Sequence, residues 1–186
     1  IQCLESVFRL NGDSFQAVVC DNSSPDNSRA VIEDWLTRKN HSITILREID
    51  LKNLHDPILS DVVMIYNERN YGYAGGNNRG LRYALAIGGD EDYVWIINND
   101  TVLDTQAMAN LLDEADRRAD ISIFGSTILD YTDHQKIQTQ AGYRFYPWWG
   151  VSRQIGGGRA LNHQLPQAEV EAKMSYIVGA SIFIRL

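Results

Sequence analysis

Three short polar segments carry the side chains most suited to chemistry in this sequence. They are Asp21–Ser24, Asn70–Gly80 and Asn98–Asp100. They follow the apolar runs 15–21, 62–66 and 93–97, each of which has the composition of a β-strand. In open α/β sheets, ligands bind outside the carboxyl ends of the strands. We therefore predict that the three segments face one crevice if their strands are parallel neighbours.

Asp100 is the candidate metal ligand of the third segment. A carboxylate that emerges from a buried strand is held rigidly, and it can bind Mg²⁺ or Mn²⁺ together with water and phosphate oxygens. Asn98 and Asn99 directly precede it. The alternative is that Asp100 only caps the turn before Thr101, and the residues by themselves leave both interpretations open.

Asp21 is the candidate for contacting a nucleotide base. Its carboxylate can accept a hydrogen bond from the imide N–H of uracil or thymine. The alternative is an Asx turn that leads into the next helix.

The segment Asn70–Gly80 reads NYGYAGGNNRG, and we expect a flexible loop that enters a helix. Such a loop lets the backbone approach a ligand closely, the helix N-terminus favours anionic groups, and Arg79 adds positive charge near a diphosphate. Alternatively, the loop is merely tight and Arg79 is solvated. The glycines match neither the G-x-G-x-x-G nor the P-loop pattern, so these two nucleotide-binding sites are disfavoured.

Strands and helical periods alternate over the first part of the chain. We expect one helix to start at Ser24–Pro25, a second to end at Gly88–Gly89, and a third to carry the apolar stripe Met108–Ala115 after a cap at Asp104 or Thr105. This alternation predicts a doubly wound, mostly parallel α/β sheet. The continuous apolar run 93–97 is expected to be a central strand covered on both faces.

The last third of the sequence has a different character. Residues 130–165 are rich in Gly, Gln and aromatic side chains, which predicts an irregular segment, and a strand is expected at 176–184. The aromatic stretch 143–149, YRFYPWW, could stack on a sugar or a lipid. The alternative is that it belongs to the core.

Composition limits the class of protein. The chain has 186 residues, of which 44% are hydrophobic and 22% charged, as expected for one globular domain. A net charge of −7 without a basic run provides no bulk field for nucleic acid or an anionic membrane, although local basic pockets remain compatible with it. Two cysteines cannot form a disulfide framework, which favours a reducing, cytoplasmic setting. No apolar run approaches the ~18 residues of a membrane span.

Three motifs in order resemble family 2 glycosyltransferases of the GT-A fold, especially the rhamnosyltransferase-like branch. They are VVCDNSSPDNS at Val18–Ser28, NYGYAGGNNRGLRYAL at Asn70–Leu85 and YVWIINNDTVLD at Tyr93–Asp104. The resemblance implies a single catalytic domain over 1–186, with a Rossmann-like sheet and flanking helices. Residues 1–126 would bind the nucleotide sugar, and the irregular part 127–186 would form an incomplete acceptor side.

The resemblance also assigns site residues. Asp21 would contact the base, and Asn98–Asp100 matches the family's D-x-D element with Asp100 as the metal ligand, although Asn98 departs from the usual Asp. Further donor-binding residues are Asn70, Gly76, Asn78, Arg79, Asn98 and Asn99. Trp148, Trp149, Gly179, Ala180 and Ser181 are the acceptor-side candidates.

The implied reaction is inverting sugar transfer from a dTDP- or UDP-sugar, with rhamnose as the candidate sugar. A divalent cation, Mg²⁺ or Mn²⁺, would assist the reaction. A glycan or lipid-linked acceptor would receive the sugar. The reaction would take place at the inner face of the cell membrane, where the full-length protein would associate peripherally. No nucleic-acid partner is expected. The family's first strand is expected before Ile1 and its catalytic base beyond Leu186, so no base is assigned here. The rival interpretations are a sugar-nucleotidyltransferase and a non-catalytic nucleotide-sugar or glycan-binding fragment.

Overall fold

The computed structural model describes residues 1–12, 15–54, 56–89 and 92–186. The chain forms two compact units: the first contains residues 1–94, 102–105 and 186, and the second contains residues 95–101 and 106–185. Strand β4 (Tyr93–Ile97) begins in the first unit and continues into the second. The predicted division at residue 126 separates a part that binds the donor from a part that binds the acceptor, and it stays a prediction.

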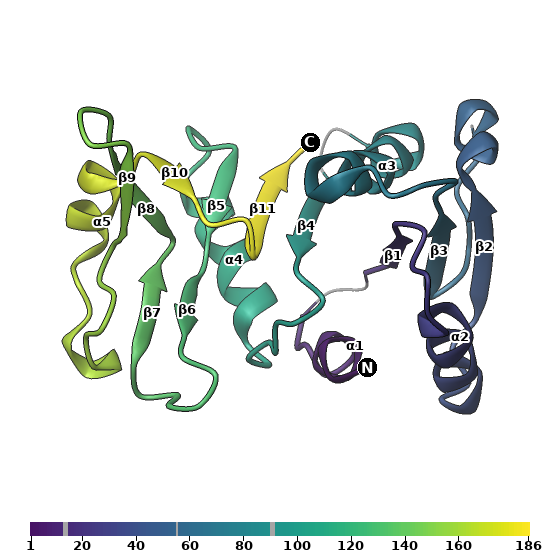
Figure 1. The fold of residues 1–186 in the computed structure, drawn as a ribbon, viewed down its shortest axis with the longest axis horizontal. Helices are drawn as coiled ribbons and strands as arrows, with labels where there is room; N and C mark the ends of the chain where they lie inside the picture. Colours follow the sequence, from purple (N-terminus) through teal and green to yellow (C-terminus); the bar gives the residue numbers. More distant parts are fainter. Residues whose placement is uncertain (13–14, 55, 90–91) are drawn as a thin grey trace. The chain divides into compact units, whose positions relative to one another are not determined.

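A parallel sheet with the order β1-β3-β2 forms the centre of the first unit (Figure 1). Its strands are β1 (Ala17–Asp21), β2 (Ile43–Arg47) and β3 (Val62–Tyr66). Asp21 and Arg47 both lie opposite Tyr66, so all three strands end at the same edge. The predicted strands at 15–21 and 62–66 are confirmed, although β1 begins two residues later than the apolar run.

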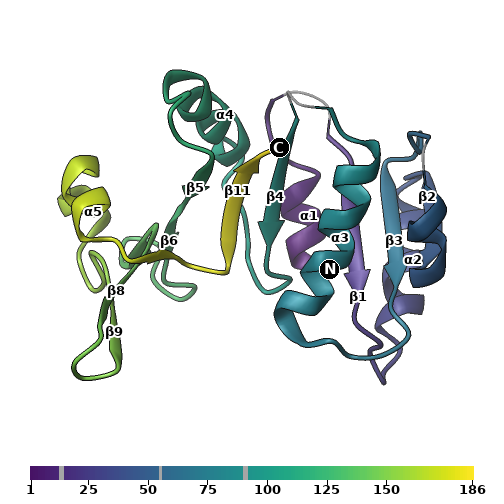
Figure 2. The same ribbon diagram turned by 90° about the horizontal axis from the view of Figure 1, so that it is seen from above.

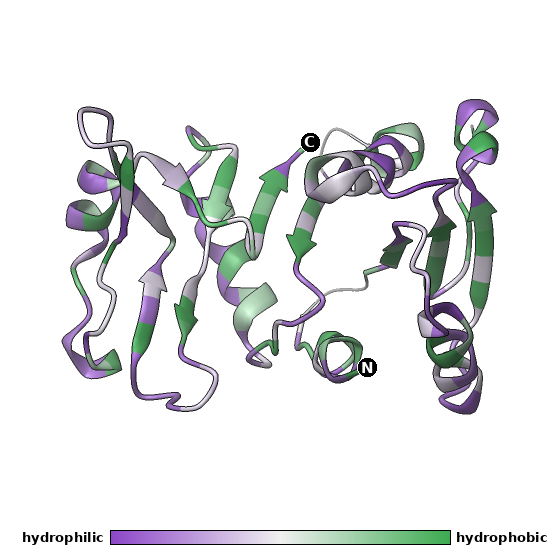
Figure 3. Cartoon of the chain, viewed as in Figure 1, coloured by the Kyte–Doolittle hydropathy of each residue, from purple (hydrophilic) through white to green (hydrophobic). Residues whose placement is uncertain are grey.

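Helices cover both faces of this sheet, as expected for a doubly wound layer. Helices α1 (Gln2–Val7) and α2 (Ser28–Arg38) pack on one face, and α3 (Gly72–Ile87) and the 3₁₀ helix η1 (Glu48–Asn53) lie on the other. Alternate residues of β3 face opposite ways, so Met64 packs with Trp35 of α2 while Ile65 packs with Tyr83 of α3. The apolar residues accordingly concentrate on the strands (Figure 3).

Helix α2 begins later than the sequence pattern predicts. Its N-cap is Asn27, not Ser24. Ser24 instead donates its backbone N–H to the carboxylate of Asp21, and Ser23 adopts a positive φ of 62°. The chain therefore makes a turn bound to Asp21 before the helix starts.

The predicted loop at 70–80 is wrong, because most of the glycine-rich segment lies within α3. A Cβ at Gly80 would lie 3.1 Å from the Cys20 sulfur, and one at Gly76 would lie 3.3 Å from the Asn22 side chain. The glycines thus let α3 approach β1 closely, which offsets the entropic cost of glycine in a helix. The helix ends at Gly88, as predicted.

The second unit contains a sheet with the order β4-β11-β5. Strand β5 spans Ile123–Gly125, and β11 spans Ser181–Arg185 and runs antiparallel to it. Helix α4 (Ala107–Arg117) buries the predicted apolar stripe, but its N-cap is Gln106. Among the described residues, β4 is an edge strand and is only half-buried, so the expectation of a central, fully covered strand is wrong.

Residues 127–177 form antiparallel hairpins, not the irregular segment we expected. Strand β6 pairs with β7, and β8 lies between β9 and β10. The predicted strand at 176–184 is split into β10 and β11 by a turn. The elements are β6 (Thr127–Leu129), β7 (Ile137–Gln140), β8 (Gly142–Tyr146), β9 (Val151–Gln154), η2 (Leu161–His163), α5 (Gln167–Lys173) and β10 (Tyr176–Ile177). No helix in the described ranges is sufficiently long and apolar to cross a membrane.

Candidate functional site

A network of side-chain amides joins the carboxyl ends of β1 and β3. The Asn22 Nδ2 group donates to Asn70 Oδ1 and to the Gly72 carbonyl, each at 3.0 Å. Its Oδ1 accepts from Asn67 Nδ2 at 3.2 Å and from the Tyr71 backbone N–H at 3.0 Å. The first two predicted polar segments therefore meet at one edge of the sheet, as expected.

Asn67 is the most buried member of this network, with 3% of its surface exposed. Its backbone N–H donates to the Asp21 carbonyl at 3.0 Å. Its side-chain Oδ1 has no hydrogen-bond partner in the described part of the chain. A buried acceptor without a partner is costly and needs an explanation, which makes this edge a candidate ligand-binding region.

Asp21 is 8% exposed and is held from two sides. Arg29 donates to its Oδ2 at 2.5 Å, and the Ser24 backbone N–H lies 3.3 Å from its Oδ1. Burial alone would raise the pKa of Asp21, but the hydrogen bonds from Ser24 and Arg29 and the Arg29 charge lower it below the usual value. The turn predicted as the alternative role of Asp21 is thus present, and the carboxylate is ionised.

Arg29 also contacts Tyr66, whose hydroxyl is hydrogen-bonded to Glu33. Its guanidinium lies 4.5 Å from the centroid of the Tyr66 ring, and the Tyr66 hydroxyl donates to Glu33. Burial, followed by the hydrogen bond to Glu33, raises the pKa of Tyr66. The carboxylate of Asp21 is therefore positioned by residues of α2 and β3.

Replacing Asp21 with asparagine should destabilise the fold in a pH-dependent manner. At neutral pH we expect a loss of about 1–2 kcal/mol, because the partly exposed Arg29 loses a charged partner. The folded-state pKa lies below the ordinary value of 3.8, so this contribution is present above that pH and disappears as the pH falls through the folded-state pKa. Urea denaturation of both proteins across this range measures it. If the difference in free energy of unfolding between the two proteins grew as the pH fell, the stabilising role of the ionised Asp21 would be contradicted.

Arg79 lies on α3 and contacts three groups. It pairs with Glu48 Oε1 at 2.7 Å, donates to the Gly75 carbonyl at 2.9 Å and stacks 3.7 Å from the Tyr71 ring centroid. Only 13% of its side chain is exposed, so the solvated alternative is wrong. Its role in donor binding remains a prediction.

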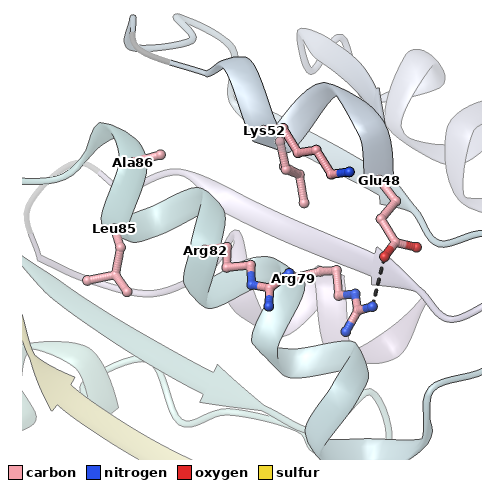
Figure 4. Close-up of a pocket in the computed structure, with 7 residues that line it drawn as sticks. Glu48, Lys52, Arg79, Arg82, Leu85 and Ala86 are labelled. Carbon is pink, nitrogen blue, oxygen red and sulfur yellow. Dashed lines mark hydrogen bonds and ion pairs between the residues drawn. The ribbon is translucent and has the colours of Figure 1, made fainter.

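A groove of about 400 Å³ separates α3 from η1 (Figure 4). The Arg79–Glu48 pair lies at one end of it, and the exposed Arg82 and Lys52 lie further along. Asn78 and Asn70, which we predicted to bind the donor, are exposed. The groove is lined by Glu48, Leu51, Lys52, Arg79, Arg82, Leu85 and Ala86.

The segment Asn98–Asp100 belongs to the second unit and forms a turn after β4. Asn98 donates its backbone N–H to the Ala180 carbonyl at 3.1 Å, and Thr101 donates to the Asn98 carbonyl at 3.2 Å. Asn99 and Asp100 are exposed. This backbone contact places Asn98 directly beside the predicted acceptor-side turn 179–181.

The Asp100 carboxylate belongs to no cluster of potential metal ligands in the described part of the chain. Within the described ranges, no hydrogen bond or ion pair is made by the Asp100 carboxylate, and no group of three or more His, Cys, Asp or Glu side chains could hold a metal ion. The predicted role of Asp100 as a metal ligand stays a prediction.

The acceptor-side candidates differ in exposure. Ser181 is 3% exposed, and its Oγ accepts from Trp95 Nε1 at 2.9 Å and lies 2.8 Å from Ser126 Oγ. It therefore anchors the turn that contains Gly179 and Ala180. Trp148 and Trp149 are 91% and 73% exposed, so the core alternative is wrong for them.

The sequence patterns give no positioning role to Asn22, Arg29, Glu48 or Asn67, although the structure places these residues around the candidates. For Asn22 and Asn67 the available signal is the pairing of β1 with β3, which places the residues just after both strands side by side.

The sequence model of the family described as Glycosyl transferase family 2 matches residues 1–168. No curated protein and no solved structure matches the chain.

Proposed function

Since the chain belongs to glycosyl transferase family 2, we propose that it is an inverting enzyme that transfers a sugar, with rhamnose as the candidate, from dTDP or UDP. Membership of this family makes it a glycosyltransferase that uses a nucleotide-sugar donor and an acceptor. Its α/β fold, with a parallel sheet between helices, is of the GT-A type. The family match over most of the chain is the observation that carries the proposal.

The first unit would supply the contacts to the nucleotide. The buried, ionised Asp21 lies at the carboxyl end of β1, and it would accept a hydrogen bond from the imide N–H of the base. Asn70, Gly76, Asn78 and Arg79 remain proposed donor-binding residues. Their support is that Asn70 and Gly76 contact Asn22, the residue next to Asp21.

The divalent cation would be held by Asp100, with Asn98 and Asn99 beside it. Family 2 enzymes commonly use such a cation, and an exposed carboxylate that forms no ion pair with any described residue fits this role. When bound, Mg²⁺ or Mn²⁺ neutralises the negative charge on a diphosphate leaving group. The chemical reason for this assignment is that a divalent cation is attracted both by the carboxylate of Asp100 and by a diphosphate.

The proposed reaction is a single displacement at the anomeric carbon. An acceptor hydroxyl forms the new C–O bond while the bond to the diphosphate breaks, and the hydroxyl proton passes to a carboxylate base. Gly179 and Ala180 would face the acceptor, with Ser181 fixing their turn. Trp148 and Trp149 would lie on the acceptor side, toward a lipid-linked acceptor at the inner face of the cell membrane.

Calorimetric titration of the full-length protein with UDP and dTDP, each with and without Mn²⁺, tests the donor assignment. We expect binding of one nucleotide that tightens with Mn²⁺. Incubation with the sugar donor and acceptor then distinguishes an enzyme from a binding module, because only the enzyme releases nucleoside diphosphate and glycosylated product. Absence of binding to either nucleotide would overturn the proposal.

A further inference from the structure

The turn between β8 and β9 exposes the largest apolar side chains of the second unit. Trp148 and Trp149 are 91% and 73% exposed, and the flanking Phe145 and Val151 are 44% and 45% exposed. Gly150 closes the turn with a φ of 60°. Figure 2 shows this hairpin projecting from the rest of its unit.

The hairpin lies in a stretch of the sequence whose charged side chains are all basic. Residues 134–168 contain no Asp or Glu, although the whole chain has a net charge of −7. Two of the cations in this stretch, Arg144 and Arg153, are on the hairpin and are exposed. The local charge is therefore opposite in sign to that of the chain.

Arg144 and Arg153 face each other directly across the β8–β9 pair. Like charges in opposite positions destabilise an antiparallel pair. Arg144 lies over the Tyr146 ring at 5.4 Å, and neither arginine forms an ion pair with a described residue. Two adjacent cations without an ion pair among the described residues would be stabilised by an anionic partner.

We propose that the β8–β9 hairpin docks on an anionic lipid bilayer. The indoles of Trp148 and Trp149 would enter the interfacial layer, where Trp is favoured because its ring is apolar and its N–H remains hydrated. Arg144 and Arg153 would contact lipid phosphates, whose charge relieves their mutual repulsion. One short hairpin thus carries both kinds of side chain, the indoles in its turn and the arginines within its strands.

The charge of the hairpin favours a bilayer over a neutral glycan. A glycan would be recognised by aromatic stacking combined with amide or carboxylate acceptors for its hydroxyl groups. The 12 residues of the hairpin, 143–154, include one amide at Gln154 and no carboxylate, whereas they place two cations beside the indoles. A bilayer offers anionic headgroups to the two arginines and an apolar layer to the two indoles.

Co-sedimentation with lipid vesicles tests this proposal. Vesicles of phosphatidylcholine alone are compared with vesicles of equal parts phosphatidylcholine and phosphatidylglycerol. The variants are Trp148→Ser with Trp149→Ser, and Arg144→Gln with Arg153→Gln. Matched controls are Leu59→Ser, an apolar side chain that is 97% exposed, and Arg82→Gln, an exposed cation elsewhere. Circular dichroism and thermal unfolding verify that each variant is folded.

We expect the wild type to bind the anionic vesicles more tightly, with a blue shift of tryptophan emission that the double serine variant lacks. The double glutamine variant should lose roughly 10- to 30-fold in affinity, at about 1 kcal/mol for each arginine near an anionic surface. Both controls should bind like the wild type. Nucleotide titration of the same variants should be unchanged, which separates membrane docking from donor binding.

Three outcomes would overturn the proposal. They are equal binding of the wild type to both vesicle types, a control that loses as much affinity as a hairpin variant, and displacement of the protein from vesicles by a soluble neutral glycan.

Discussion

Replacing Asn22 with alanine is expected to lower the free energy of unfolding of the protein by about 2–4 kcal/mol. The substitution removes four hydrogen bonds at once. The side chain of Asn67, which is 3% exposed and already has an unpaired oxygen, would lose the partner of its Nδ2 group. The backbone N–H of Tyr71, the N-cap of α3, would lose its acceptor as well, so one donor after β3 and one at the start of α3 become unpaired.

Urea denaturation followed by tryptophan fluorescence, to which the buried Trp35 contributes, measures this effect. Hydrogen exchange of the amides of residues 67–72 should accelerate, because Asn22 connects this segment to β1. Asn110→Ala, an exposed asparagine on α4, is the matched control and should change stability by less than about 0.5 kcal/mol. If Asn22→Ala were as stable as this control, the hydrogen bonds of Asn22 would not determine the conformation at the carboxyl ends of β1 and β3.

Replacing Asp100 with asparagine is expected to remove the effect of Mn²⁺ on nucleotide affinity. The amide has nearly the same shape but no negative charge, so the ligand for a hard cation is lost while the turn is retained. We expect a loss of at least about 100-fold in Mn²⁺-dependent affinity, because removing even an outer-shell partner of a metal costs 10- to 100-fold. The affinity measured without Mn²⁺ should stay the same.

Calorimetric titrations of both proteins with nucleotide, in the presence and absence of Mn²⁺, measure this difference. Asp116→Asn on α4 provides a control with the same loss of charge at an exposed position. A variant in which Mn²⁺ still tightened nucleotide binding fully would exclude Asp100 as the metal ligand.

Some features of the first unit were predictable because they depend on local patterns. The apolar runs predict the positions of β1 and β3, since a strand covered on both faces needs consecutive apolar residues. The alternation of strands and helices predicts parallel pairing, and this places Asn22 beside Asn67 and Asn70. The family motifs add candidate roles for Asp21 and Asp100, which remain proposals.

Other features depend on partners that are distant in the sequence. Glycine-rich composition indicates a loop, but residues 72–80 are helical because Gly76 and Gly80 pack against residues at the end of β1. Arg79 resembles a solvated cation in the sequence, and only the fold brings Glu48 and Tyr71 to it.

The sequence by itself determined the class of fold, the family and the positions of the candidate carboxylates, because burial patterns and motifs are properties of neighbouring residues. The tertiary structure alone decided which side chains hold Asp21, how the glycine-rich segment folds and which strands pair over 127–177. These depend on contacts between residues far apart in the chain, and their free energies arise only when the segments pack together.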